Sequence, residues 1–348
     1  MQGRVHHNNF NLVRLLAATQ VLLVHGINHF EYNVWFVDGV KAVPGVPAFF
    51  FTSGFLIYFA YERMHSRDRP GFFINRLLRI YPALLVCVLV SILTVYWTGY
   101  FNGRQIGVTR FLAWVASQTT IFQFYNPPFM REYGVGVLNG ALWTISVEMQ
   151  FYFLVPVLYF LLKNRPRLLA TVFAVSLVVN VVANLALIRQ PAIWDHMAMK
   201  LLMVSFVPHL YMFLFGFWLA SDTPLREYLQ KTHLIYLLLA YVLSMNFIGS
   251  YAANASNSIN PVSFVLLACI VLKVSALRLP IPGRLQSFLE TTDFSYGLYL
   301  YHMPLLNLLL VLALFSPLAN IGLLTGITLL AAIASWYLIE RPALSHKR

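Results

Sequence analysis

Long runs of apolar residues, separated by short polar and basic segments, recur along this chain. A helix that crosses a bilayer needs about 20 mostly apolar residues, because the hydrocarbon core is about 30 Å thick and a helix rises about 1.5 Å per residue. Runs of this length predict spans near residues 11–30, 44–61, 81–100, 142–162, 168–188, 201–220, 233–250, 260–277, 294–315 and 319–339. The pattern therefore predicts an all-α membrane protein of about ten transmembrane helices.

A further apolar stretch at 109–124 is amphipathic and is interrupted by polar residues such as Ser117 and Gln118. The positive-inside rule decides whether it crosses the membrane. If it does not cross, 17 of the 24 Lys and Arg lie on the cytoplasmic side and six on the outer side, with Arg14 inside the first span. If it crosses, every later basic loop inverts. We therefore expect cytoplasmic N- and C-termini and an amphipathic or re-entrant segment near 109–124.

The composition excludes several classes of protein. Hydrophobic residues make up 59% of the 348 and charged residues 10%, with a mean hydropathy of +0.69. Soluble domains carry about 25% charged residues, so soluble enzymes and disordered proteins are excluded. The net charge of +12 lies in short clusters between apolar runs, which is not the pattern of a nucleic-acid binder. Cys87 and Cys269 lie inside apolar runs and predict neither a disulfide framework nor a metal site.

Ionisable residues at membrane depth are costly and therefore mark candidate functional positions. Arg14 and His25 share the first span and one helix face, because eleven residues turn roughly 20° past three full turns. Counting from the span ends places both His25 and Glu148 about 9 Å below the outer edge. A carboxylate level with an imidazole predicts a pair in which Glu148 orients His25 as a general base. The alternative is a buried, satisfied histidine and a glutamate that packs between helices.

Arg76 and Arg79 lie three residues apart before the third span and therefore point the same way at the cytoplasmic interface. Two guanidiniums there can grip the phosphates of a nucleotide-like donor. The alternative is an ordinary positive-inside anchor that reaches lipid headgroups.

Other polar residues in the apolar runs have more than one interpretation. Ser53 precedes Gly54, and this pair in a membrane helix is more often a packing contact than a nucleophile. His302 is ambiguous between a functional and a structural role. Glu340 precedes Arg341 at the end of the last run, which predicts a local ion pair.

Six segments, in order along nearly the whole chain, resemble motifs of the acyltransferase 3 family of integral membrane acyltransferases. Each is weak alone, but their order and their positions in the predicted helices are specific. They are Arg14 and His25 with ten residues between them, FTSGFLI at 51–57, RLLRIYP at 76–82, LWTISVEMQFY at 142–152, FSYGLYLYHMP at 294–304 and YLIERP at 337–342.

The resemblance implies a single integral membrane acyltransferase domain over residues 1–348. Such a protein transfers an acyl group, commonly acetyl, from cytoplasmic acyl-coenzyme A to a hydroxyl of a cell-surface glycan, such as lipopolysaccharide, or of a lipid-linked sugar. A bacterial inner membrane and the stand-alone form, without an appended extracytoplasmic hydrolase-like domain, are implied as well. Acetyl-coenzyme A is the donor substrate, and no tightly bound cofactor or metal is expected.

Carried over by position, the resemblance implies His25 as the catalytic histidine with Arg14 as its partner. Arg14 is also placed to meet the pantetheine or pyrophosphate of the donor. Arg76 and Arg79 become donor contacts and Glu148 an acid of the site. The family often has an arginine pair before Leu-Leu-Arg, whereas Asn75 stands first here.

The sequence alone decides neither which further residues line the site nor the path of the reaction. The candidate lining residues are Ser53, Trp143, Tyr301 and His302. Direct transfer and an acyl-histidine or acyl-serine intermediate are equally compatible with the sequence. Two alternative functions are a transporter or flippase of a lipid-linked glycan, which also uses intramembrane charges, and an intramembrane serine protease. Transporters usually contain inverted repeats, which this chain lacks.

Overall fold

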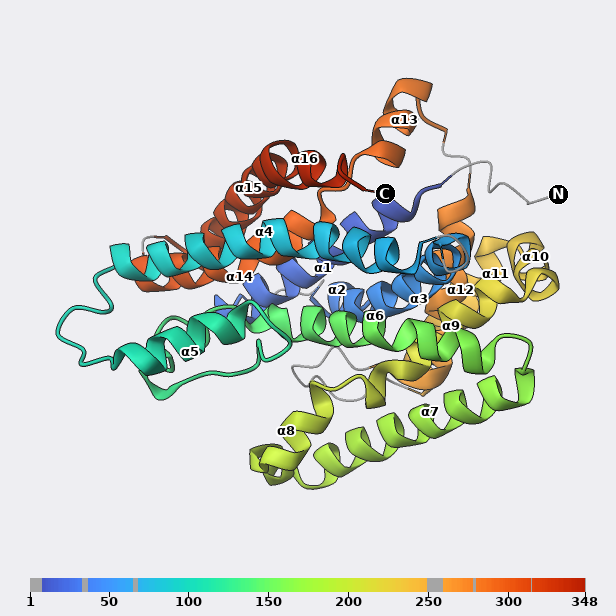
Figure 1. The fold of residues 1–348 in the computed structure, drawn as a ribbon, viewed down its shortest axis with the longest axis horizontal. Helices are drawn as coiled ribbons and strands as arrows, with labels where there is room; N and C mark the ends of the chain where they lie inside the picture. Colours follow the sequence, from blue (N-terminus) through green and yellow to red (C-terminus); the bar gives the residue numbers. More distant parts are fainter. Residues whose placement is uncertain are drawn as a thin grey trace. The chain divides into compact units, whose positions relative to one another are not determined.

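The computed structural model describes residues 8–32, 37–64, 68–248, 259–277, 280–313 and 315–347 (Figure 1). Within these residues the chain forms helices and no β-strand. Seven helical segments are long and apolar enough to cross a membrane, or eight if one bent helix pair is a single span. The all-α, multi-pass membrane fold is therefore confirmed. The number of ten spans and the cytoplasmic position of both ends stay predictions.

Among the described residues, nine of the ten predicted apolar runs each coincide with one helix, and the run at 201–220 is divided between two helices. The long helices are α1 (Phe10–His29), α3 (Gly45–Met64), which follows the short α2 (Val37–Lys41), α4 (Arg69–Trp97), α6 (Trp143–Leu162), α7 (Pro166–Arg189), α14 (Ser295–Leu312) and α15 (Pro317–Ser335). The chain bends by 43° between α8 (Met197–Met203) and the segment that contains α9 (Leu210–Ser221). Two shorter apolar helices are α11 (Leu234–Phe247) and α12 (Pro261–Ala276). Three further short helices in the described residues are α10 (Thr223–Lys231), α13 (Gly283–Thr291) and α16 (Arg341–Leu344).

The amphipathic stretch predicted at 109–124 forms α5 (Val108–Gln118). Its eleven residues span about 16 Å, roughly half of the hydrocarbon thickness. One face is buried through Trp114, Ser117 and Gln118, whereas Leu112 is exposed. Trp114 packs in a cluster with Val95 of α4 and other apolar residues. This packing attaches α5 to the end of α4, and α5 is too short to cross the membrane by itself.

The described residues belong to two compact units. Unit 1 comprises Met1–Ala17, Ala42–Phe72 and Gln150–Asp293, and unit 2 comprises Ala18–Lys41, Phe73–Met149 and Phe294–Arg348. The organisation of the chain as one domain stays a prediction.

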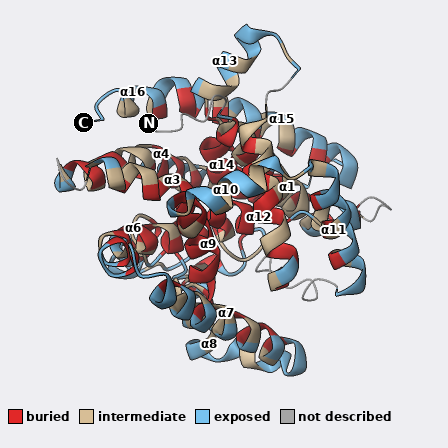
Figure 2. Cartoon of the chain, turned by 90° about the vertical axis from the view of Figure 1, so that its right-hand side faces the viewer, coloured by how far each residue is buried: buried red, intermediate tan, exposed pale blue. Residues whose placement is uncertain are grey.

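Unit 1 is built around α9, which is buried along most of its length (Figure 2). It packs closely on α3 because a glycine on each helix lets the backbones approach. A Cβ atom on Gly54 would lie 2.0 Å from the carbonyl oxygen of Phe213, and one on Gly216 would lie 2.2 Å from that of Phe51. The packing role that the Ser53-Gly54 pair predicts is therefore present at Gly54.

Unit 2 is organised by α14, most of whose residues are buried (Figure 2). It packs on α15, where a Cβ on Gly297 would lie 2.8 Å from the Cα of Ala332. Asn307 of α14 also fixes the segment before α6: its amide donates to the carbonyl oxygens of Val137 and Leu138, and its oxygen accepts from the backbone N–H of Val135. These bonds position the residues that surround the candidate site.

Candidate functional site

His25 lies on α1 between two other histidine rings of unit 2. The ring of His29, one helical turn further along α1, stacks on it with centroids 5.8 Å apart and planes 7° apart. The ring of His302, on α14, lies 5.3 Å away and is tilted by 40°. His25 is partly exposed, whereas His302 is fully buried. The structure thus joins two predicted site residues that are distant in the sequence.

The orientation of the His302 ring is fixed by the backbone of its own helix. Its Nδ1 lies 2.7 Å from the carbonyl oxygen of Tyr299, and a carbonyl accepts, so Nδ1 carries the proton. In the described parts of the chain, the buried Nε2 atom has no hydrogen-bond partner. A neutral imidazole with this tautomer presents a lone pair at Nε2.

The tyrosine beside this ring connects α14 to the start of α6. The hydroxyls of Tyr299 and Thr144 share a hydrogen bond of 2.6 Å, and both groups reach the carbonyl oxygen of Ala141. Glu148, further along α6, is near enough to Tyr296 and Tyr299 to interact electrostatically with both. The ring contacts of His25 are with His29 and His302, and its pairing with Glu148 stays a prediction.

Arg79, a predicted donor contact, has an acidic partner in unit 2. Its guanidinium lies 3.6 Å from the carboxylate of Glu340 and 5.5 Å from the ring centre of Tyr296. Glu340 is 2% exposed and accepts a hydrogen bond from Ser335. It ends a π-helical turn, Trp336–Glu340, a rare conformation that is frequent at functional sites.

The local ion pair that we expected between Glu340 and Arg341 is therefore wrong. The π-helical turn directs the carboxylate inward to Arg79 of α4, whereas the Arg341 side chain is exposed. Arg76, three residues before Arg79, is partly buried on the same helix. Both arginines lie where the sequence placed them, and their contact with a donor stays a prediction.

Arg14 and Ser53 belong to unit 1. The Arg14 guanidinium forms an ion pair of 2.5 Å with Asp293, and both side chains are largely buried. The same turn of α1 is held by Asn11, whose amide donates to the carbonyl oxygen of Glu290. Ser53 is partly buried on α3. Sequence reasoning assigned Arg14 to the donor and missed its acidic partner.

The remaining lining candidates lie in unit 2. Trp143, the first residue of α6, is partly buried, and Tyr301 of α14 is buried beside His302. Among the described residues, no group of three or more His, Cys, Asp or Glu side chains is arranged to hold a metal ion.

Several contact residues were missed at the sequence level although signals for them existed. His29 follows His25 by four positions and therefore lies on the same helix face. Asp293 is one of twelve acids in the chain and stands directly before the motif at 294–304. Tyr299 and Thr144 lie inside two of the motifs, but nothing in the sequence pairs them.

The segment predicted to lie on the outer face exposes aromatic side chains, including Phe122 and Tyr125. Arg104 lies over the Tyr100 ring at 4.1 Å and forms an ion pair of 2.8 Å with Glu132. The hydrogen bond that Arg104 donates to Glu132 raises the pKa of Arg104, and burial raises the pKa of Tyr100. This part of unit 2 offers aromatic faces beside a charged pair.

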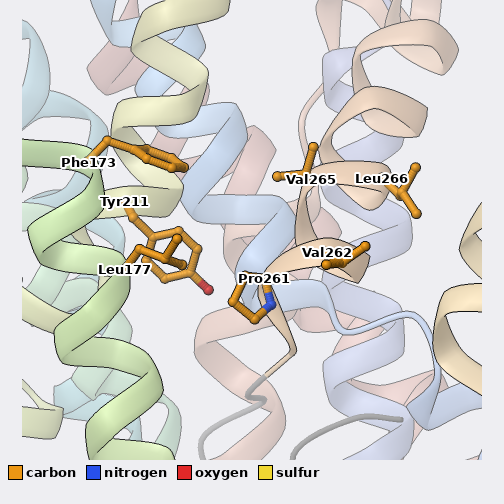
Figure 3. Close-up of a pocket in the computed structure, with 7 residues that line it drawn as sticks. All are labelled: Phe173, Leu177, Tyr211, Pro261, Val262, Val265 and Leu266. Carbon is orange, nitrogen blue, oxygen red and sulfur yellow. The ribbon is translucent and has the colours of Figure 1, made fainter. Parts of the chain in front are cut away.

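Unit 1 contains an apolar cavity of about 370 Å³ between α7, α9 and α12 (Figure 3). It is lined by Phe173, Leu177, Tyr211, Pro261, Val262, Val265 and Leu266. Its lining holds none of the predicted site residues and offers no acid–base group apart from the phenol of Tyr211. The cavity is therefore suited to hold apolar groups rather than to carry out proton transfer.

Comparison with known proteins gives matches over the whole chain. The sequence profile of the acyltransferase 3 family, described as an acyltransferase domain, matches residues 7–340. The chain is 29% identical to nodulation protein 10 of Rhizobium leguminosarum bv. viciae, over 97% of this chain and 94% of that protein. It is 24% identical to an O-acetyl transferase of Shigella phage Sf6, over 97% and 96%. A 29% match to O-acetyltransferase OatA of Staphylococcus aureus covers 47% of this chain and 28% of that protein. No solved structure matches.

Proposed function

Because the chain belongs to the acyltransferase 3 family and is a membrane-bound O-acyltransferase, we propose that it transfers an acetyl group from cytoplasmic acetyl-coenzyme A to a hydroxyl of a cell-surface glycan or lipid-linked sugar. The membrane in this proposal is a bacterial inner membrane, where the donor is available on the cytoplasmic side. Two of the relatives are named as O-acetyl transferases, which supports acetyl as the group transferred.

The observation that carries the proposal is the position of His25. It is a partly exposed imidazole within a span, and its ring is held on two sides by neutral aromatic rings. A histidine that acts as a general base needs an unprotonated ring nitrogen and a ring with a fixed orientation. The two ring contacts of His25 restrict its orientation. Intramembrane histidines are expensive to keep unless they serve a function.

The reaction proceeds by attack of the acceptor oxygen on the thioester carbonyl. His25 takes the hydroxyl proton as the new C–O bond forms, and the C–S bond breaks with its electron pair on sulfur. The coenzyme A thiolate is a weakly basic leaving group, so stabilising the oxyanion matters more than protonating the sulfur. Glu148, near the Tyr296 and Tyr299 hydroxyls, supports the positive charge that develops on this side of unit 2.

The donor is bound at the cytoplasmic end of α4 in this proposal. Arg76 and Arg79 are one helical turn apart on α4, a spacing that suits two phosphate contacts. Glu340 holds Arg79 in place until the donor phosphate arrives. Arg14, which belongs to unit 1, stays a predicted donor contact by itself.

The acceptor is bound by the lining residues and by the aromatic segment on the outer face. Trp143 and Tyr301 present aromatic surface in unit 2, and Phe122 and Tyr125 are exposed. Flat aromatic rings pack against the apolar faces of sugars.

The test is an assay of detergent-purified protein with acetyl-coenzyme A carrying a label on the acetyl group. We expect thiol release that is slow without acceptor and faster with a membrane glycan extract, and no release above background from His25→Ala. Folded wild-type protein that neither binds nor cleaves the donor would refute the proposal. Full activity in His25→Ala would refute the catalytic role of His25 and leave the proposed acyl transfer intact.

A further inference from the structure

The ring of His302 is held in one orientation and one tautomer. It is fully buried, its Nδ1–H donates to the carbonyl oxygen of Tyr299 at 2.7 Å, and the Tyr299 ring packs against it with centroids 5.7 Å apart. Since Nδ1 carries the proton, Nε2 is an acceptor.

This acceptor has no hydrogen-bond partner in the described parts of the chain. A buried polar atom without a partner costs free energy, and in native proteins such an atom calls for an explanation. The bond to Tyr299 uses Nδ1 alone, so it does not account for the buried Nε2 atom.

The ring from which Nε2 of His302 can accept a hydrogen bond is that of His25. The two centroids are 5.3 Å apart and the planes are tilted by 40°, so the two rings are direct neighbours. His29 covers one face of the His25 ring by stacking. The other titratable groups around the pair are the Tyr299 phenol and, beyond it, Glu148.

We propose that His302 is a positioning residue for His25 in the acyl transfer, an inference that rests on the proposed function. A rotation of the His25 ring brings its N–H to Nε2 of His302, which then accepts it, and this leaves the other nitrogen of His25 unprotonated toward the acceptor hydroxyl. The hydroxyl proton moves to that nitrogen as oxygen bonds to the acyl carbon and the C–S bond breaks. The imidazolium is then stabilised by the Nε2 lone pair until its proton passes to the thiolate or to water.

A neutral partner suits this location. A carboxylate beside His25 would place a permanent charge at membrane depth in the resting enzyme, which is costly. Two neutral imidazoles carry no charge until the proton is transferred, and the charge then spreads over both rings. His302 thus takes the part that an aspartate takes in soluble catalytic triads.

Two substitutions separate this role from a structural one. His302→Gln places an amide oxygen near the position of Nε2 but loses the bond to Tyr299, whereas His302→Asn keeps that bond and removes the acceptor. We expect kcat to fall about 10- to 100-fold in His302→Asn with an unchanged KM for acetyl-coenzyme A, and to fall less in His302→Gln. A purely structural role predicts the opposite order, and that order would overturn the inference.

A buried histidine of unit 1 provides the matched control. The Nε2 atom of His209 bonds the carbonyl oxygen of Met203 at 2.9 Å, and its ring packs on Phe50. His209→Gln keeps an amide near that position and should change kcat little. Activity in wild type and none in His25→Ala, with both His302 variants near wild type, would overturn the role of His302 and leave the proposed function intact. If the folded wild-type protein showed no transfer activity, the proposed function would be overturned instead.

A measurement on the wild-type protein covers the case in which His302→Asn does not fold. Nitrogen-15 NMR of protein labelled at histidine should show an N–H···N hydrogen bond between the His25 and His302 rings. A His302 Nε2 with the chemical shift of a free imidazole nitrogen would overturn the inference.

Discussion

The guanidinium of Arg14 and the carboxylate of Asp293 lie 2.5 Å apart, although 279 residues separate them in the chain. Asp293 is 7% exposed at its side chain and Arg14 is 20% exposed, so this ion pair is largely shielded from solvent. The motif arginine therefore has a structural partner before any substrate arrives.

We expect Arg14→Ala to destabilise the protein by roughly 3 kcal/mol, because it leaves the Asp293 carboxylate buried without its cation. Thermal unfolding in detergent measures this change. The double variant Arg14→Ala, Asp293→Ala should regain much of the lost stability, because neither charge is then left without its partner. Recovery of transfer activity together with stability would show that Arg14 has no role beyond this ion pair.

Glu340→Gln should weaken donor binding. The substitution keeps the size of the side chain but removes the charge that lies 3.6 Å from Arg79, so the guanidinium loses this ion pair. We expect the KM for acetyl-coenzyme A to rise about tenfold, the effect of losing about 1.4 kcal/mol, with kcat little changed. Steady-state kinetics with varied donor test this.

Arg76→Lys is the companion variant on the same helix. The ammonium group of lysine cannot form the bidentate hydrogen bonds that a guanidinium forms with phosphate. This variant should therefore also raise the KM for the donor and leave the KM for the acceptor unchanged. If both variants kept the wild-type donor KM, the two arginines would be membrane anchors.

Gly54→Ala should disrupt unit 1. The added Cβ would lie 2.0 Å from a backbone oxygen of α9, and this clash is relieved only if the two helices move apart. Overpacking of this kind costs about 1–3 kcal/mol, so less folded protein and a lower unfolding temperature are expected. Gly322→Ala on α15 is the control, because no atom lies within 4 Å of its added Cβ. Equal stability of both variants would contradict the close packing.

Asn307→Leu should loosen the segment before α6. It removes three hydrogen bonds to the backbone of Val135, Val137 and Leu138, each contributing about 0.5–1.5 kcal/mol. Faster tryptic cleavage after Arg131 would report the change. Asn246→Leu, at an exposed amide bonded within its own helix, should leave the cleavage rate unchanged.

The membrane helices could be predicted from the sequence because hydrocarbon thickness imposes a length on each apolar run. The partner of His25 could not. Depth was counted only for His25 and Glu148, and this count paired those two residues. The length of an apolar run fixes neither the tilt of its helix nor the helices on which it packs, so the run alone does not place His302 beside His25.

The partner of Arg79 was missed for a different reason. Glu340 and Arg341 are neighbours, and an ordinary helix end would expose both. The π-helical turn at Trp336–Glu340 rotates the glutamate inward, and this turn has no signature in the hydrophobic pattern.

Polar side chains fasten α14 along its length: Tyr296 to the carbonyl oxygen of Ile80, Tyr299 to Thr144, and Asn307 to the segment before α6. A helix secured at these levels cannot rotate without breaking several buried bonds. The His302 ring is therefore preassembled beside His25, and its ordering is completed once, during folding, rather than in every catalytic cycle.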